Sequence, residues 1–231
     1  MELHLISLII PVFNEESLIE EEIKVLRQVS TLLPIEIIVV DGGSSDGTVE
    51  IAERTADRLI SSPLKNRSSQ MRLGAEAAKG ELLIFLHADT RLHLDWQKAV
   101  ISCFESKGQK VVAGAFKLKF NSDSSIYKLI AFLANCRTQI TGVPQGDQAL
   151  FVSSQAYKES GGFPQVPLME EYLFIPNLRK LGSIKILNQE ILSSVRRYVK
   201  NGPFRNSFKN SFLVLLFYLG VSPKRLATWY N

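Results

Sequence analysis

Cysteine is scarce in this chain, and both a long apolar run and a basic leader are missing. Cys103 and Cys136 are the two cysteines among 231 residues, and their spacing favours buried reduced thiols over a disulfide or a zinc site. No stretch approaches the roughly 18 apolar residues of a membrane span. Residues 1–6 lack the basic segment of a signal peptide. These absences predict a cytoplasmic protein whose membrane contact, if any, is peripheral.

Acidic residues are absent from the last part of the chain. From Ile191 onward there are seven Lys or Arg and no Asp or Glu, whereas the first 190 residues carry 20 basic and 23 acidic side chains. The net charge of +4 therefore hides an acidic body and a basic tail. Such a tail suits a partner with phosphates, either a ligand or a membrane surface. Helix-turn-helix, zinc-finger and aromatic single-strand patterns are missing, so we expect no nucleic-acid partner.

Three short apolar runs alternate with amphipathic segments. Residues 5–10, 35–40 and 82–86 are typical of strands buried on both faces of a parallel sheet. Pro11 is expected to end the first strand, and Asn14 to cap the helix that follows. The pattern predicts an α/β fold in which helices flank a Rossmann-like, mostly parallel sheet. The alternation in residues 111–120 predicts a half-exposed strand where the sheet turns antiparallel or reaches an edge.

Polar side chains follow the buried strands, where open α/β sheets bind ligands. His87 and Asp89 are two residues apart, so both can face one ligand and form half of a metal site. An Asp in that position also suits a turn or a helix cap. Asp41 has no evident structural task, because Ser45 and Asp46 are better placed as caps, and it can accept hydrogen bonds from a base or ribose.

Further charged residues carry two interpretations each. Glu170 and Glu171 either stabilise the dipole of a helix or include a general base. Arg67 opens a predicted helix and either reaches a phosphate or is solvated. Arg196 and Arg197 lie in residues 193–198, which resemble a strand with paired guanidinium groups.

The last predicted helix, residues 206–219, is apolar nearly all round in its second half. It is too short to span a bilayer. It can pack on a partner subunit in a homodimer, cover the domain, or lie in a membrane interface with Lys209, Lys224 and Arg225 near the headgroups.

Taken together, three motifs resemble the family-2 glycosyltransferases of the GT-A fold. They are the segments 9–15 (IIPVFNE), 39–48 (VVDGGSSDGT) and 85–89 (FLHAD). The second half resembles a small cytosolic subgroup associated with arsenosugar or selenium-related gene neighbourhoods. The residues concerned are 146–148 (GDQ), 161–164 (GGFP), 167–171 (PLMEE), 196–197 (RR) and 220–223 (GVSP). The resemblance covers nearly the whole chain.

This resemblance implies an inverting transferase that uses a UDP- or GDP-sugar and an acceptor hydroxyl. It implies a nucleotide-sugar half at 1–90, an acceptor and catalytic half at 91–200, and a helical extension at 201–231. Asp89 would bind a divalent metal, Mn or Mg, with His87 as a second ligand or a donor contact. The residues implied for the donor are Pro11, Asn14, Glu15, Asp41, Arg67, His87, Arg196 and Arg197.

The chain departs from the family pattern in three places. His87 replaces the first acid of the Asp-X-Asp motif, which leaves the choice of metal open. Glu171 stands where the usual catalytic Asp would be, and Asp147 is the next candidate for the base. Pro176 is expected to interrupt the helix after Glu171. Two alternatives remain: a sugar-nucleotide-binding protein with weakened catalysis, and a nucleotidyltransferase. A nucleotidyltransferase is expected to carry basic residues after the first strand, where this chain has acidic ones. Two features point to different acceptors. The lack of a membrane span favours a small soluble acceptor, whereas the apolar basic tail favours a lipid phosphate.

Overall fold

The computed structural model describes residues 3–106 and 108–230, without the side chains of Arg197, Lys200, Asn201, Phe204 and Asn206. The strands are β1 Ile6–Val12, β2 Ile35–Asp41, β3 Arg58–Ser61, β4 Leu82–Phe85, β5 Thr90–Arg91, β6 Val111–Phe120, β7 Phe151–Ser153 and β8 Ser183–Ser193. The helices are α1 Ile19–Gln28, α2 Thr48–Thr55, α3 Arg67–Ala77, α4 Trp96–Glu105, α5 Ser125–Thr141, the 3-10 turn Gly146–Gln148, α6 Ser154–Glu159, α7 Glu170–Arg179, α8 Arg196–Asn201, α9 Pro203–Tyr218 and α10 Pro223–Tyr230.

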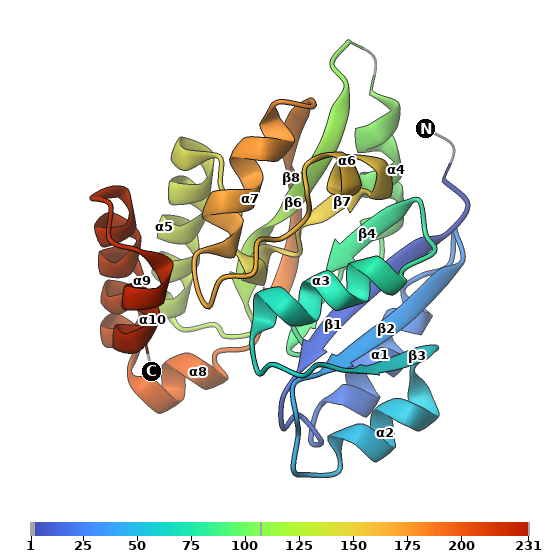
Figure 1. Ribbon diagram of the computed structural model, residues 1–231, viewed down its shortest axis with the longest axis horizontal. Helices are drawn as coiled ribbons and strands as arrows, with labels where there is room; N and C mark the ends of the chain where they lie inside the picture. The colour runs from blue at the N-terminus through green and yellow to red at the C-terminus, as the bar shows by residue number, and fades with distance from the viewer. Residues whose placement is uncertain (1–2, 107, 231) are drawn as a thin grey trace.

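The described strands form one mixed sheet in the order β3-β2-β1-β4-β7-β6-β8-β5 (Figure 1). The first four strands are parallel, and β1 pairs with β2 from Ile6↔Ile35 to Val12↔Asp41. The inner strands β1 and β4 are almost entirely buried, because helices cover both faces of the sheet, whereas Arg58 and Ser61 of the edge strand β3 are exposed. The predicted parallel α/β arrangement is confirmed for this half.

The second half of the sheet is mixed. β7 runs antiparallel to both β4 and β6, while β6 is parallel to β8. The expected antiparallel turn therefore occurs, but β6 is an inner strand and not half exposed. Lys119 is its exposed residue and Lys117 is partly buried, while the rest of the strand is buried. The alternation was misleading because a lysine can lie beside the sheet on its aliphatic stem.

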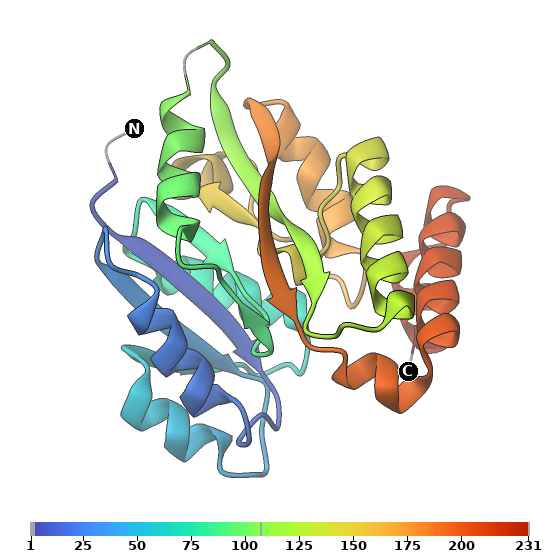
Figure 2. The same ribbon diagram turned by 180° about the vertical axis from the view of Figure 1, so that it is seen from behind.

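Two layers of helices sandwich the sheet. Residues of α1, α2 and α4 pack on one face, with Ile23 and Trp96 in that core. Residues of α3, α6 and α7 pack on the other face, joined by Leu213, Val214 and Leu226 of α9 and α10. Figure 1 shows α3 and α7 in front of the sheet, and Figure 2 shows α1, α4 and α5 on the opposite side. The carboxyl ends of β1, β2 and β4 are left free for loops.

Two expectations at the end of β1 are wrong. β1 continues through Pro11, and the Val12 carbonyl still accepts a hydrogen bond from the Gly42 N–H. Pro11 has no N–H to donate toward β4, but no donor is needed there because β4 has already ended. Asn14 does not cap a helix, because α1 begins at Ile19. It instead adopts a left-handed conformation with φ 53° in the connecting loop.

The C-terminal elements also differ from expectation. β8 ends at Ser193, and Arg196 and Arg197 open the helix α8 rather than lying on a strand. The predicted last helix is present as α9, and α10 follows it. In the part of the chain that is described, no helix combines the length and apolarity that crossing a membrane needs.

Candidate active site

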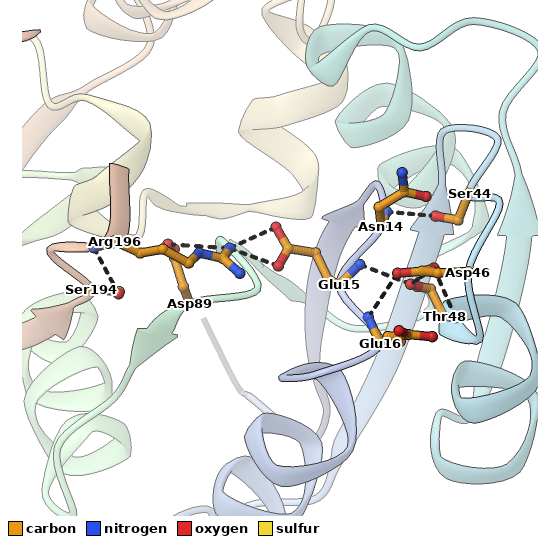
Figure 3. A network of polar contacts seen from close by, with 9 residues as sticks. All are labelled: Asn14, Glu15, Glu16, Ser44, Asp46, Thr48, Asp89, Ser194 and Arg196. Atoms are coloured by element: carbon orange, nitrogen blue, oxygen red, sulfur yellow. Dashed lines mark hydrogen bonds and ion pairs between the residues drawn. The ribbon is translucent and has the colours of Figure 1, made fainter. Parts of the chain in front are cut away.

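Two loops at the carboxyl ends of β1 and β2 bind each other through hydrogen bonds. The Asn14 N–H donates to Ser44 Oγ at 2.8 Å, and Asn14 Oδ1 accepts from the Ser45 N–H at 2.9 Å. Next to this pair, the Glu15 N–H donates to Thr48 Oγ1 at 2.8 Å. Figure 3 shows Asn14 beside Ser44 of the second loop, whereas the Glu15 carboxylate points toward Arg196. These contacts give the edge of the sheet a fixed polar rim before any ligand arrives.

Asp41 shapes the second of these loops. Its carboxylate accepts from the backbone N–H groups of Gly43 at 2.8 Å and Ser44 at 3.1 Å, and the residue is 4% exposed. The view that Asp41 has no structural task is therefore wrong. Asp46 does serve the following helix, accepting from the Thr48 N–H at 3.1 Å. A nucleoside contact by Asp41 stays a prediction.

Arg196 joins this rim to the end of the central strand β4. Its Nη2 lies 2.9 and 2.7 Å from the two carboxylate oxygens of Glu15, and 3.9 Å from Asp89 Oδ2. The Ser194 N–H also donates to the Asp89 carbonyl at 3.2 Å. In Figure 3 the guanidinium lies between the two acids. The arginine neutralises a cluster that would otherwise hold two adjacent negative charges.

A divalent cation fits the acid at this position. The Asp89 side chain is 11% exposed, and its carboxylate is paired with a cation 3.9 Å away, so the site already accepts positive charge. Among residues 3–106 and 108–230, no three His, Cys, Asp or Glu residues gather to enclose a metal. Cations that act on diphosphates are commonly held by one or two protein carboxylates plus phosphate oxygens. Asp89, with His87 beside it in the chain, matches that incomplete ligand set.

A second group of the predicted residues lines a pocket of about 160 Å³. His87 comes from the end of β4, Arg67 from the start of α3, Asp147 from the 3-10 turn, and Glu170 and Glu171 from the start of α7. Arg67 Nη1 lies 3.8 Å from Glu170 and 3.6 Å from Glu171. The pocket thus combines one guanidinium with several acids at the working edge of the sheet.

Glu171 is the electrostatically unusual member of this pocket. The residue is 8% exposed. Burial, and then the charge of Glu170, raise the pKa of Glu171 to about 8, against the opposing effect of Arg67. A carboxyl group with a raised pKa in a cleft is a common mark of an acid or base in catalysis. The arrangement can take a proton from a hydroxyl placed beside it.

The backbone around Glu171 corrects the expectation for Pro176. α7 runs unbroken from Glu170 to Arg179 with Pro176 inside it. Phe174, Ile175 and Leu178 are fully buried on the same helix, and their burial holds the helical form past the proline. Met169, just before the two acids, has φ 66° and turns the chain sharply into the helix. The acids therefore begin the helix in a fixed orientation.

Gly146 allows Arg67 to enter the pocket. A Cβ at Gly146 would lie 1.6 Å from Arg67 Nη2, so any side chain there would displace the guanidinium. In the sequence, Gly146 stands out only as part of a motif. Nothing in the local pattern shows that Arg67, 79 positions earlier, occupies the space that a side chain at residue 146 would need.

Several residues of the site were missed. Gln145 Nε2 donates to the Tyr172 hydroxyl at 3.0 Å at one wall of the pocket. Gln70 Nε2 donates to the carbonyls of Val12 and Val40, holding the ends of β1 and β2 together. Asn210 and Tyr230 bring the C-terminal helices to the pocket. A single amide or a tail aromatic carries no local signal of such a role.

The predicted residues therefore fall into two groups. Arg67, His87, Asp147 and Glu171 line the pocket, while Asn14, Glu15, Asp89 and Arg196 form the neighbouring polar rim. His87 and Asp89, two residues apart, connect the groups. Pro11 lies inside β1, and the Arg197 side chain falls outside the described residues.

Comparisons with known proteins show a matching family model and similar sequences. The model of the family described as glycosyl transferase family 2 matches residues 7–158. Glycosyltransferase AglE of Haloferax volcanii is 27% identical over 170 aligned residues, covering 69% of this chain and 56% of AglE. The undecaprenyl-phosphate 4-deoxy-4-formamido-L-arabinose transferase of Proteus mirabilis is 28% identical over 236 aligned positions, covering 96% of this chain and 69% of the relative.

Solved structures share the fold. The mannosyltransferase PcManGT of Pyrobaculum calidifontis, in complex with GDP-Man and Mn²⁺, gives a TM-score of 0.66 at 16% identity and covers all of this chain and 80% of its own. Glucosyl-3-phosphoglycerate synthase of Mycobacterium tuberculosis gives 0.58 at 22% identity, covering 81% of this chain and 70% of the synthase. The chain thus spans a little over half of AglE and about 70% to 80% of the other three proteins.

Proposed function

The chain belongs to glycosyl transferase family 2, and on that premise we propose that it transfers a sugar from a nucleotide-diphosphate sugar to an acceptor hydroxyl with inversion. The observation that carries the proposal is the pocket in which Glu171, with its raised pKa, lies 3.6 Å from Arg67 and which His87, two residues from Asp89, also lines. The order of strands and the two helix layers are those of the GT-A fold. Residues 1–90 supply the donor side, residues 91–200 the acceptor side, and residues 201–231 a helical extension.

The donor is held at the polar rim. Asn14, Glu15 and Asp41 lie at the carboxyl ends of β1 and β2, where a base and ribose fit an open α/β sheet. Pro11 supports this position from inside β1. Arg67, Arg196 and Arg197 supply positive charge for the diphosphate, because guanidinium groups bind phosphates in a bidentate, charge-assisted way. UDP- and GDP-sugars are the proposed donors, as the solved relatives named above include a GDP-Man complex.

Asp89 and His87 are the proposed ligands of a divalent cation, Mn²⁺ or Mg²⁺. When bound, such a cation neutralises the charge that develops on the leaving diphosphate. Arg196 already neutralises Asp89 in the free protein, at 3.9 Å. The contact of Arg196 with Glu15 is shorter than its contact with Asp89. Arg196 can therefore keep its ion pair with Glu15 while Asp89 binds the cation.

Glu171 is the proposed general base. Its carboxylate removes the proton of the acceptor hydroxyl as that oxygen attacks the anomeric carbon and the bond to the diphosphate breaks. Arg67 holds the ionised carboxylate in place, and Asp147 is the alternative base at the same pocket. A base is needed for a hydroxyl acceptor but not for a phosphate oxygen that is already ionised. Glu171 therefore favours a hydroxyl acceptor over the lipid phosphate in the name of the Proteus mirabilis relative.

The size of the pocket limits what enters it. A volume of about 160 Å³ is below the usual range for drug-sized ligands, so it receives the reacting end of the acceptor rather than a whole large molecule. The resemblance to the arsenosugar and selenium-associated subgroup, carried by the Gly146–Gln148 turn and the Glu170–Glu171 pair, points to a small polyhydroxylated acceptor.

The decisive experiment screens purified protein against UDP- and GDP-sugars with Mn²⁺ or Mg²⁺, measuring release of the nucleoside diphosphate. Nuclear magnetic resonance of the product then reads the configuration at the anomeric carbon. Metal-dependent release with an inverted product supports the proposal. Binding of a donor by calorimetry without any release would show a sugar-nucleotide-binding protein instead, and a retained configuration would contradict Glu171 as the base.

A further inference from the structure

Helix α9 exposes an apolar stripe although its opposite side is already buried. Leu213 and Val214 pack into the core, whereas Phe208, Phe212, Leu215 and Leu219 are 73%, 47%, 54% and 72% exposed. Their spacing of four, three and four residues places them along one line of the helix. Phe208 and Phe212 stack with their ring centroids 6.1 Å apart. A helix that is apolar on both sides needs a second partner.

Helix α5 repeats this pattern beside α9. Leu129, Phe132, Leu133 and Ile140 are 52%, 63%, 56% and 85% exposed, and Phe132, Leu133 and Ile140 lie three, four and eleven residues after Leu129. Contacts join α5 and α9, and Figures 1 and 2 both show the two helices next to each other at one end of the molecule. We call the exposed apolar residues of α5 and α9 the apolar end face. It exceeds the scattered apolar residues that any surface carries.

The charged residues of α5, α9 and α10 are all basic, although Asp123, just before α5, pairs with Lys128 at 3.7 Å. Helices α5, α9 and α10 each carry two Lys or Arg and no Asp or Glu: Lys128 and Arg137, Arg205 and Lys209, and Lys224 and Arg225. Arg137 points inward, since its Nε is buried, and the other five supply the charge at the surface. Trp229 of α10, 47% exposed, adds an aromatic group next to Arg225. Basic and aromatic residues around an apolar surface are the composition that binds the headgroup region of an anionic bilayer.

We propose that the apolar end face docks on the surface of an anionic lipid bilayer. A second copy of the chain is the main competitor for this surface. A two-fold dimer would bring the same basic helices together from both copies, and like charges opposed at an interface disfavour association. An anionic headgroup layer complements those charges instead. The bilayer is therefore the occupant that satisfies both the apolar and the charged residues.

Docking there places the reaction beside the membrane. Asn210, Leu213 and Val214 of α9 and Tyr230 of α10 line the pocket that holds Glu171. The same helices thus present one side to the pocket and another to the lipid. The docking surface itself is independent of the transfer reaction, because lipid binding needs neither donor nor acceptor.

Vesicle flotation tests the proposal with the full chain. Wild-type protein is mixed with vesicles of phosphatidylcholine alone or of phosphatidylcholine with phosphatidylglycerol, at low and at raised salt. We expect a partition onto the anionic vesicles that is larger by about tenfold or more and that salt weakens.

Two variants separate the apolar and the charged contributions. The double variant Phe208→Gln/Leu215→Gln keeps helix-forming residues and should reduce binding to anionic vesicles about tenfold or more. Lys224→Gln/Arg225→Gln should remove most of the preference for anionic lipid. Leu32→Gln and Lys98→Gln, exposed residues outside α5, α9 and α10, are the matched controls and should bind like wild type. Circular dichroism confirms that each variant is folded.

Three results would overturn the proposal. Wild-type protein could ignore anionic vesicles, or the controls could lose binding as much as the end-face variants. In the third case, analytical ultracentrifugation shows a dimer that Phe208→Gln/Leu215→Gln dissociates, which assigns the face to a second copy. Failure of nucleotide-sugar turnover alone would leave the vesicle result intact, so the two proposals fail separately.

Discussion

Replacing Glu171 by glutamine is the sharpest test of the catalytic assignment. Glutamine keeps the size of the side chain but cannot accept a proton, so turnover should fall by about 100-fold to 10,000-fold, the usual contribution of a general base. That fall corresponds to about 3–5 kcal/mol of activation free energy. Donor binding should survive, because Arg67 keeps Glu170 as a partner 3.8 Å away.

The pH dependence gives a second measure of the same residue. Burial and Glu170 raise the pKa of Glu171 to about 8, so below that pH the ionised fraction falls about tenfold per pH unit. Wild-type kcat/KM should rise about tenfold per unit until it levels near pH 8, and Glu171→Gln should lack this rise. The measurement is release of the nucleoside diphosphate across the pH range under saturating metal.

Stability should follow the same titration with a defined sign. The pKa of Glu171 is higher in the folded chain than its ordinary value of 4.5, so the folded chain keeps a proton that the unfolded chain releases. Its contribution to stability is present at low pH and is lost as the pH rises from about 4.5 to about 8. The Tm of Glu171→Gln relative to wild type should therefore increase across that window.

Two further variants decide the interpretation. Glu170→Gln removes an acid at nearly the same distance from Arg67 and should be milder, since Glu171 remains. Glu171→Asp retracts the carboxylate by about one carbon-carbon bond and should cost rate if the site fits the longer side chain. Unchanged turnover in Glu171→Gln would refute the reasoning and transfer the role to Asp147. A faster Glu171→Asp enzyme would instead show that the pocket suits a shorter acid.

Three other changes probe the rest of the site. Asp89→Asn should abolish metal-dependent donor binding in a manganese titration by calorimetry while Tm is kept, and unchanged affinity would remove Asp89 from the metal site. Asp41→Ala should lower stability by about 1–3 kcal/mol, because the backbone N–H groups of Gly43 and Ser44 lose a charged acceptor, and should weaken nucleotide binding; chemical denaturation showing no loss would contradict its role in the loop. Gly146→Ala should displace Arg67 and thereby shift the pH profile of turnover upward, since Glu171 loses its counter-charge; an unshifted profile would show that Arg67 does not act on the base.

The parallel half of the fold was predictable because its signals are local. β1, β2 and β4 are mostly apolar, with Ser7 and Glu36 as the polar residues before their last positions, and polar residues follow each strand. β8 was largely missed because Asn188, Gln189 and Glu190 interrupt its apolar pattern, and these polar residues are tolerated where the strand is partly open to solvent. Arg196 was expected on a strand, but β8 ends at Ser193 and the chain turns into α8.

The sequence named the residues of the candidate site, but it did not show how they are arranged in space. Motif positions singled out Asp89, Glu171 and Arg67, and the structure brings Arg67 to Glu171 across 104 positions of chain. The ion pair of Glu15 with Arg196 joins residues 181 positions apart, and no periodicity in the sequence encodes such a contact. Pro176 shows the opposite error. The rule that proline interrupts a helix is valid locally, but burial of the neighbouring residues keeps α7 helical.

The two-residue strand β5 has a consequence for how charge is placed in this protein. Thr90 pairs with Ser193 at the rim of the sheet, and the residues next to that pair on either strand are Asp89 and Ser194, which are themselves hydrogen-bonded. Arg196 follows two residues later. Asp89, just before β5, and Arg196, shortly after β8, therefore flank opposite strands of one short β5–β8 pair. The register of the two backbones sets the distance between the acid and the guanidinium. A one-residue shift in the register of β8 would move Arg196 away from both Asp89 and Glu15. The charge arrangement of the donor side therefore depends on β8, the strand that the sequence pattern largely failed to predict.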